Sequence, residues 1–207
     1  SPQDACAAGP GTWHVFLLAG QSNMAGRGRI SDGCASAMAE ADARIAVWGR
    51  DGSWKFPARH PLHDDKPEKV GVGPGLAFAR GIVDFFPAGE QQIGLVPCAV
   101  GGSEIARWTA PDGDLFTSAV ERVRQAQCAG GVLKGILWHQ GESDAGSEED
   151  AAQYADRLRA TIRNLRVECG APDVPVVLGE LGMSFLDMVN DSRFRFAERV
   201  NDAIVEV

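Results

Sequence analysis

The fold of this chain is decided by the stretch His14-Val15-Phe16-Leu17-Leu18-Ala19-Gly20-Gln21-Ser22-Asn23-Met24-Ala25-Gly26. Its first half is a short apolar run that ends at Gly20, which is typical of a buried strand. The polar residues that follow would lie at the carboxyl edge of a sheet, where open α/β folds bind their ligands. If a helix begins near Ser22, the free N–H groups of its first turn point at whatever that serine attacks. Ser22 is therefore the candidate nucleophile, and the alternative is that it only caps a helix.

Length and composition indicate one ordinary globular domain over residues 1–207, with 44% hydrophobic and 23% charged residues. The net charge of −8 argues against a nucleic-acid partner, and no apolar run is long enough to cross a membrane. The sequence starts at Ser1 without a signal-type segment, so the protein is intracellular or its signal has been removed. We favour the second case and expect a secreted or extracytoplasmic protein.

The five cysteines are too few and too scattered for a disulfide scaffold or a zinc site. One or two disulfides are compatible with the sequence, and loop-like surroundings favour a pair between Cys6 and Cys34. Cys98 ends a buried run and is typical of a small core residue. We expect neither a metal nor a cofactor.

Strands and helices alternate along the chain. Apolar runs predict strands at 15–19, 93–97, 132–138 and 174–178, and Arg50-Asp51-Gly52 predicts a hairpin between 45–48 and 53–56. Helical spacing and end signals predict helices over 74–86, 115–126, 147–169 and 194–204, the third opening with an approximate capping box of Ser147 and Asp150. This order predicts an α/β fold whose parallel sheet is covered on both faces.

Polar, glycine-bearing stretches follow three of the predicted strands, and in a parallel sheet these strand ends meet at one crevice. A serine nucleophile needs donors aimed at the developing oxyanion. The backbone of Ser22, the pair Gly101-Gly102 and the Gln140 amide could supply them, since glycine allows close backbone approach. Alternatively, the glycine pair is only a tight turn and Gln140 only a loop residue bonded to backbone.

Five ordered motifs resemble the sialate O-acetylesterase-like branch of the SGNH hydrolases, which includes the acetylxylan esterases of carbohydrate esterase family 6. They are Gly20-Gln21-Ser22-Asn23-Met24-Ala25-Gly26, Pro61-Leu62-His63-x-Asp65, Gly71-Val72-Gly73-Pro74-Gly75, Val96-Pro97-Cys98-Ala99-x-Gly101-Gly102 and Trp138-x-Gln140-Gly141-Glu142-Ser143-Asp144. The resemblance spans about residues 14–180.

The resemblance implies a flavodoxin-like three-layer α/β/α sandwich with a central parallel sheet. It implies that Ser22 is the nucleophile, that Gly101 or Gly102 is the second oxyanion donor, and that Gln140 replaces the asparagine of most SGNH enzymes. The implied activity is removal of acetyl groups from carbohydrate, such as acetylxylan, through an acetyl-serine intermediate and without metal.

One departure from the family is the catalytic base. The family's late Asp-x-x-His motif is absent from these 207 residues, and a serine hydroxyl needs a base at neutral pH. We expect the histidine and aspartate to lie C-terminal to Val207, on a segment that adds a strand beside 174–178 and covers the apolar residues of the helix over 194–205. The alternative bases within the chain are His63 and His139.

Glu142 and Trp108 are candidate substrate-binding residues, although a lone tryptophan is more often a packing residue. The pair Glu142 and Asp144 could also suggest glycosidase chemistry, but two acids in one loop have no partner across a cleft. Two other functions stay open: a non-catalytic carbohydrate-binding protein on the same scaffold, and a general short-chain carboxylesterase.

Overall fold

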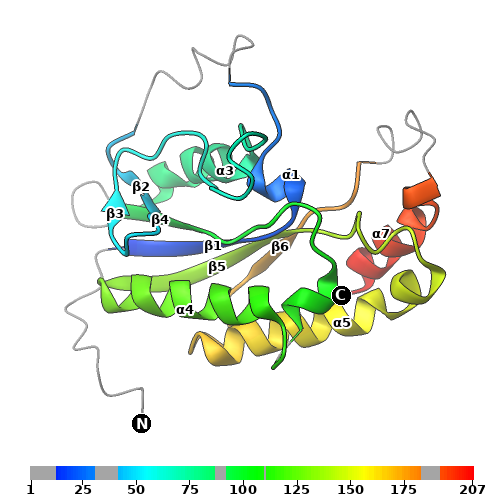
Figure 1. Cartoon of the computed structure of the whole chain (residues 1–207). Helices are drawn as coiled ribbons and strands as arrows, with labels where there is room; N and C mark the ends of the chain where they lie inside the picture. The colour runs from blue at the N-terminus through cyan, green and yellow to red at the C-terminus, as the bar shows by residue number, and fades with distance from the viewer. Residues whose placement is uncertain (1–12, 31–41, 87–91, 110, 183–191) are drawn as a thin grey trace.

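The computed structural model describes residues 13–30, 42–86, 92–109, 111–182 and 192–207 (Figure 1). The expected pairing of Cys6 with Cys34 falls outside these residues. Within them, Cys128 is disulfide-bonded, whereas Cys98 and Cys169 are free thiols.

A sheet of six strands lies at the centre of the described residues, in the order β3-β2-β4-β1-β5-β6. The strands are β1 (Trp13–Gly20), β2 (Ile45–Trp48), β3 (Trp54–Lys55), β4 (Gln92–Pro97), β5 (Gly131–His139) and β6 (Val176–Leu178). Neighbouring strands pair in parallel except β2 and β3, which form the predicted hairpin. The order β4-β1-β5-β6 is that of the first strands of a flavodoxin-like sheet, numbered 2-1-3-4. The predicted α/β class is confirmed.

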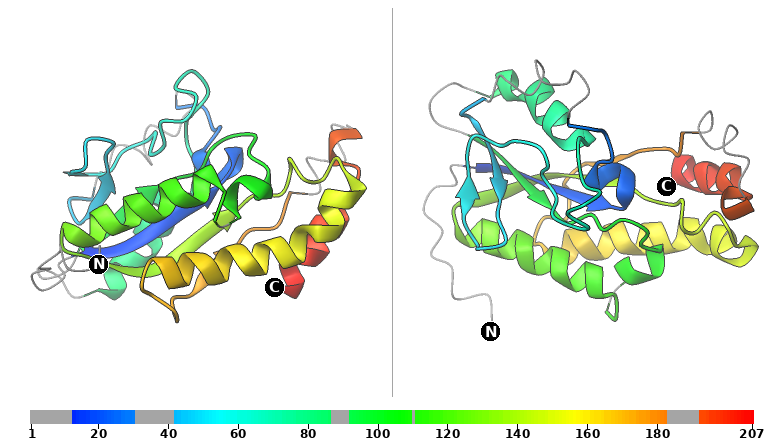
Figure 2. Two further views of the ribbon diagram at one scale, coloured as in Figure 1. Left: turned by 60° about the horizontal axis from the view of Figure 1, so that its bottom comes forward. Right: turned by 45° about the horizontal axis from the view of Figure 1, so that its top comes forward.

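Helices cover both faces of the sheet (Figures 1 and 2). One face carries α1 (Ser22–Ala25) and α3 (Pro74–Ile82), and the other carries α4 (Asp114–Cys128) and α5 (Glu148–Glu168). The helix α7 (Ala197–Glu206) packs against α5, and short 3₁₀ turns lie at Val83–Phe85, Ile105–Trp108 and Ser192–Phe194. None of the helices in the described ranges combines the length and apolar character of a membrane span.

The strand β1 is apolar on both faces because both faces are covered. Successive side chains of a strand point to opposite sides, so Val15 and Leu17 join the core under α4 and α5, whereas Phe16 and Leu18 join the core under α3. Three of these side chains are fully buried, and Phe16 is 7% exposed. This double burial fixes the position of the polar residues that follow β1.

Local end signals act as the sequence predicts. Pro74 occupies the first turn of α3, where its missing N–H costs nothing. The Ser147 side chain accepts a hydrogen bond from the Asp150 N–H at 3.3 Å and caps α5. Gly170 follows α5 with a φ of +62°, the left-handed conformation that glycine adopts without steric cost.

From the sequence we expect a segment C-terminal to Val207 to cover the apolar residues of the helix over 194–205, but within the described residues α5 already covers two of them. Val200 and Ile204 are only 0% and 4% exposed, because α7 packs against α5. The loop after β5 adds a close contact, since a Cβ built at Gly141 would lie 2.6 Å from Val200 Cγ1. The apolar side of this helix therefore needs no additional strand to cover it. The strand β6 lies at the edge of the described sheet, where Val177 is 56% exposed.

Candidate active site

Ser22 lies just past the carboxyl end of β1, beside the end of β5. Gly20 is level with His139 in the parallel pairing, and the Gln21 N–H donates to the His139 carbonyl at 2.9 Å. Gly20 has a φ of +128°, and a Cβ at this position would lie 2.1 Å from the His139 carbonyl oxygen. Only glycine allows this close approach. The strand can therefore turn here and present Ser22 at the edge of the sheet.

Ser22 lines a cleft of about 1160 Å³ at this edge. The strand-end residues in its wall are Gln21, Ser22, Asn23, Gly102, His139, Glu142 and Ser143. The other lining residues include Arg27, Glu104, Glu180, Leu181, Gly182, Arg193 and Phe194. Among the described residues, neither the Ser22 hydroxyl nor its backbone N–H has a hydrogen-bond partner. Both groups can therefore engage a ligand in the cleft.

The structure distinguishes between the two glycines of the expected oxyanion hole. The Gly101 N–H is already used, since it donates to Asp65 Oδ2 at 2.7 Å. Gly102 lines the cleft with a φ of +77°, and no described residue accepts its N–H. Gly102 is thus the residue whose backbone donor is available beside Ser22.

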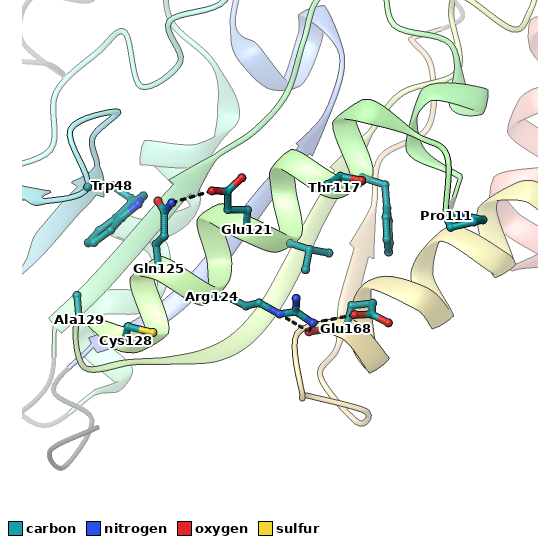
Figure 3. Close-up of a pocket in the computed structure, with 12 residues that line it drawn as sticks. Trp48, Pro111, Thr117, Glu121, Arg124, Gln125, Cys128, Ala129 and Glu168 are labelled. Atoms are coloured by element: carbon teal, nitrogen blue, oxygen red, sulfur yellow. Dashed lines mark hydrogen bonds and ion pairs between the residues drawn. The ribbon is translucent and has the colours of Figure 1, made fainter. Parts of the chain in front are cut away.

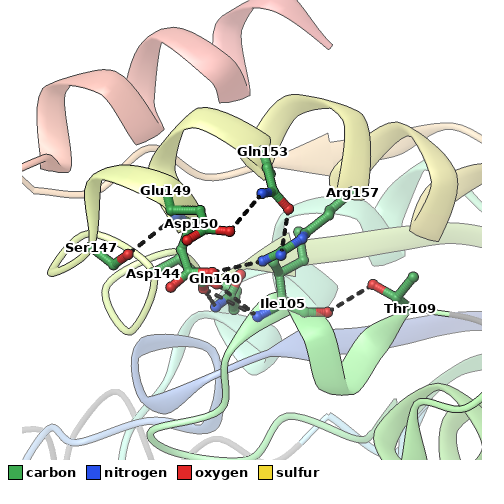
Figure 4. Close-up of polar contacts among 9 residues, drawn as sticks. All are labelled: Ile105, Thr109, Gln140, Asp144, Ser147, Glu149, Asp150, Gln153 and Arg157. Atoms are coloured by element: carbon green, nitrogen blue, oxygen red, sulfur yellow. Dashed lines mark hydrogen bonds and ion pairs between the residues drawn. The ribbon is translucent and has the colours of Figure 1, made fainter.

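Gln140 does not lie in the cleft wall. Its side chain is fully buried. Its amide donates to Ser103 O at 2.9 Å and to Gln21 Oε1 at 3.2 Å, and it donates to Asp144 Oδ2 at 2.5 Å (Figure 4). The Tyr154 hydroxyl donates to Gln140 Oε1 at 3.0 Å. The amide links Gln21, the residue before Ser22, to Ser103, the residue after Gly102. This arrangement does not support a direct contact between Gln140 and an oxyanion.

Asp144 completes this buried network. Its carboxylate accepts the Ile105 N–H at 3.1 and 3.2 Å in addition to the Gln140 amide, and the residue is 1% exposed. Burial raises the pKa of Asp144 from 3.8 to about 6, although these two donors act in the opposite direction. Asp144 therefore belongs to the support of the site, which agrees with the weak case for a glycosidase pair.

The four histidines of the chain all lie in the described residues, and only His139 lines the cleft with Ser22. His63 is 4% exposed and has no hydrogen-bond partner for either ring nitrogen among the described residues. Burial lowers the pKa of His63 to about 4. Of the two alternative bases named from sequence, the structure thus brings only His139 to the cleft.

The two candidate substrate-binding residues differ in position. Glu142 lines the cleft, accepts a hydrogen bond from the Asn23 side chain through Oε1, and has a buried Oε2 without a partner among the described residues. Trp108 is fully buried instead, with its ring 5.2 Å from that of Trp138 and its N–H donating to Ser103 Oγ at 3.2 Å. The prediction that Trp108 binds substrate is wrong, because the tryptophan packs in the core.

A second hollow of about 820 Å³ lies over α4, far from this chemistry (Figure 3). Its wall includes Trp48, Phe116, Val120 and the ion pair of Arg124 with Glu168 at 2.7 Å. Its one cysteine, Cys128, is disulfide-bonded, so the hollow holds no free thiol. Nor do the residues of the described ranges form any group of three or more His, Cys, Asp or Glu that could hold a metal ion.

Sequence reasoning missed the residues that hold Gly101. Asp65 and Lys66 come from the loop before α3, and Lys66 Nζ donates to the Gly101 carbonyl at 2.6 Å. Asp65 ends one of the five motifs that resemble the family, so the sequence marks it as a notable residue. The motif does not indicate that Asp65 binds the Gly101 N–H. Glu180, Arg193 and Phe194 also line the cleft. They lie outside the five motifs, so the sequence did not indicate a role for them in the site.

Comparison with known proteins agrees with this geometry. A family model described as carbohydrate esterase, sialic acid-specific acetylesterase, matches residues 12–206. A probable carbohydrate esterase of Arabidopsis thaliana is 33% identical over 193 residues, which cover 86% of this chain and 74% of the relative. An X-ray structure of an Arabidopsis thaliana protein is 32% identical with a TM-score of 0.80, covering 94% of this chain and 80% of that chain.

Two more distant structures show the same fold. The crystal structure of NanS is 21% identical with a TM-score of 0.71 and covers 95% of this chain and 74% of that chain. A carbohydrate acetylesterase from Xanthomonas citri is also 21% identical, with a TM-score of 0.58, covering 93% of this chain and 47% of that chain. The family match and the Arabidopsis relative carry the assignment. The chain therefore belongs to the carbohydrate esterase family of sialic acid-specific acetylesterases, and it is a carboxylic ester hydrolase.

Proposed function

We propose that this protein removes O-acetyl groups from carbohydrate with Ser22 as its nucleophile. The observation that supports the proposal is the shared cleft, which both Ser22 and Gly102 line. Among the described residues, the Ser22 hydroxyl and the backbone N–H groups of Ser22 and Gly102 have no hydrogen-bond partner. A nucleophile next to two oxyanion donors is the arrangement that acyl transfer requires.

The reaction proceeds in two steps. Ser22 Oγ attacks the acetyl carbonyl carbon while a histidine takes the hydroxyl proton, and the resulting oxyanion accepts hydrogen bonds from Ser22 N–H and Gly102 N–H. The intermediate collapses, the sugar oxygen leaves with the proton from the histidine, and acetyl-serine remains. Water then attacks the acetyl-serine by the same route and releases acetate.

Among the four histidines, His139 supports the role of the base best, because it lines the cleft and His63 does not. A histidine base is normally oriented by a hydrogen bond at its second nitrogen. Nδ1 of His139 is buried without a partner among the described residues.

The substrate class we propose is an acetylated sugar, with acetylated xylan and O-acetylated sialic acid as the two to compare. Glu142 supports a sugar, because its buried and unpartnered Oε2 in the cleft wall can accept a hydrogen bond from a hydroxyl group. The disulfide at Cys128 supports an oxidising, extracytoplasmic compartment.

The proposal is tested with Ser22→Ala and His139→Asn on para-nitrophenyl acetate, acetylated xylan and O-acetylated sialic acid. Ser22→Ala should remove hydrolysis of all three esters without changing the thermal midpoint. Full turnover by Ser22→Ala would reject the nucleophile. Loss of turnover in His139→Asn would identify the base, whereas retained turnover would show that the base lies outside residues 1–207. Activity on the aryl ester alone would favour a general short-chain esterase.

A further inference from the structure

The loop that carries Asp65 and Lys66 holds the peptide group from which the second oxyanion donor comes. Asp65 Oδ2 accepts the Gly101 N–H at 2.7 Å, and Lys66 Nζ donates to the Gly101 carbonyl oxygen at 2.6 Å. Two adjacent residues thus bind both polar groups of Gly101. The Asp65 side chain is 8% exposed and also accepts from Arg27 Nη2 at 3.3 Å.

The Gly101 carbonyl and the Gly102 N–H belong to one peptide group. The cis peptide bonds of the described residues lie elsewhere, before Pro57 and Pro61, so this group is trans. In a trans peptide the C=O and N–H point in opposite directions. Lys66 Nζ therefore lies on one side of the peptide, and the Gly102 N–H leaves from the other. Gly102 lines the cleft, whereas Lys66 does not.

Lys66 can act on this donor in two ways. Two consecutive glycines have wide conformational freedom, which the turn bond from the Ser103 N–H to the Val100 carbonyl at 3.2 Å only partly restricts. The Lys66 bond to the Gly101 carbonyl further restricts the direction of the N–H. A charge-assisted bond to the carbonyl oxygen is shorter and stronger than a neutral one. It also polarises the peptide, because bonds along one chain of donors and acceptors strengthen each other. The Gly102 N–H becomes a better donor to an oxyanion.

The backbone of Lys66 provides an independent observation. Lys66 has a φ of +45°, the only positive φ of a non-glycine residue in the described ranges. This conformation is unfavourable for a lysine, and such residues cluster at functional sites. The Lys66 carbonyl accepts the Lys69 N–H at 2.8 Å and the Val70 N–H at 3.1 Å. The turn thus holds Lys66 in the unfavourable conformation from which its ammonium group reaches Gly101.

We propose that Lys66 is a positioning residue of the oxyanion hole, which orients and polarises the Gly101–Gly102 peptide so that the Gly102 N–H stabilises the tetrahedral intermediate. This inference rests on the proposed function, because it requires an oxyanion formed by attack of Ser22. It adds a residue that contacts neither the substrate nor Ser22. Lys66 comes from a loop that is remote in the sequence from both Ser22 and Gly102.

The test compares Lys66→Met, Lys66→Arg and Lys66→Gly with Lys69→Met, which removes a lysine from the same turn, on para-nitrophenyl acetate. Oxyanion donors act on the transition state, so the loss should fall on kcat and leave KM nearly unchanged. We expect kcat to fall roughly 10-fold in Lys66→Met, less than the ~100-fold that loss of a whole donor costs. Lys66→Arg should recover most of kcat, since arginine keeps the charge and the donors.

Lys66→Gly separates this role from a structural one. It removes the ammonium group but suits the positive φ, so it should fold well and still lose kcat as Lys66→Met does. Three results would each overturn the proposal. They are an unchanged kcat in Lys66→Met, a recovered kcat in Lys66→Gly, and a loss of kcat in Lys69→Met as large as that in Lys66→Met. Ser22→Ala is measured in parallel, because turnover without Ser22 would reject the proposed function, whereas Ser22-dependent turnover that ignores Lys66 would reject only this inference.

Discussion

Asp144 is the buried carboxylate on which the support below Ser22 depends. It accepts hydrogen bonds from the Gln140 amide and the Ile105 N–H. Gln140 in turn donates to the Gln21 side chain and to the Ser103 carbonyl, so one network holds the chain just before Ser22 and just after Gly102. A buried network of this kind is stable only when each member is satisfied.

The charge of Asp144 makes stability depend on pH. Burial raises its pKa from 3.8 to about 6 in the folded protein, so between these values the folded state binds more protons than the unfolded state. The Asp144 contribution to the free energy of unfolding therefore falls as the pH rises through this interval and is constant above it. In Asp144→Asn this contribution is absent.

The first prediction compares urea unfolding of wild type and Asp144→Asn between pH 3.8 and about 6. The free energy of unfolding of wild type minus that of the variant should decrease as the pH rises. Asp156→Asn is the control, since the Asp156 side chain on α5 is 92% exposed. A difference that does not change with pH would contradict the raised pKa of Asp144.

At the scale of one residue, the sequence placed Ser22 at the strand end but could not assign partners. Gly101 and Gly102 look alike in the sequence, and the choice between them depends on Asp65, which lies far away in the chain. Gln140 and Trp108 were expected at the ligand, yet both are fully buried. A polar motif does not reveal which of its side chains turn inward, because that depends on contacts with distant residues.

Among the elements, α5 connects the site to the core. Its first turn carries Glu148, Glu149 and Asp150, and further along Tyr154 reaches Gln140. The Arg157 side chain bonds Asp150 at 2.9 Å and Gln153 at 2.6 Å on the outer side of the same turns (Figure 4). Acidic residues near a helix N-terminus and basic residues further on both stabilise the helix.

The second prediction concerns the cap of α5. Ser147→Ala should lower the free energy of unfolding by about 1 kcal/mol, because the Asp150 N–H loses its acceptor. Ser147→Asp keeps an acceptor at the cap and should preserve stability. Thermal or urea unfolding of the three proteins gives the answer, and equal stability of Ser147→Ala and wild type would show that water replaces the cap without cost.

Elements were easier to predict than their contacts. Helical spacing and end signals placed α3, α4 and α5 within a few residues, because each helix has one apolar side and clear caps. The partner of α7 was predicted wrongly. The apolar stripe of the helix predicts that Val200 and Ile204 are buried, but it does not predict which element buries them. In the structure α5 packs against them.

For the whole molecule, acid stability should reflect two buried groups that act in opposite directions. Burial lowers the pKa of His63 from 6.5 to about 4. Between these values the unfolded state binds more protons, so the His63 contribution to stability falls as the pH falls, whereas that of Asp144 rises. The contributions of His63 and Asp144 to the free energy of unfolding therefore change in opposite directions between about pH 4 and about pH 6, and they offset each other there.

The third prediction is that His63→Leu makes the protein less sensitive to acid. The variant removes a buried group whose pKa burial lowers to about 4 in the fold. It also replaces two ring nitrogens that have no hydrogen-bond partner among the described residues with apolar atoms. The free energy of unfolding of the variant should exceed that of wild type most at low pH. Leu62→Ala is a packing control that should destabilise the protein equally across the range. A variant curve parallel to wild type would contradict the lowered pKa of His63.

The residues that line the cleft differ in origin, and this has a consequence for how such enzymes diversify. One group follows the strand ends, includes Ser22 and Gly102, and is fixed by the sheet. A second group includes Glu180, Arg193 and Phe194, which lie outside the regular strands and helices of the central layer or in a short turn before α7. Changes in the second group leave the strand-end group in place. Selection or laboratory evolution can therefore alter which acetylated sugar is accepted while the hydrolytic step is inherited unchanged.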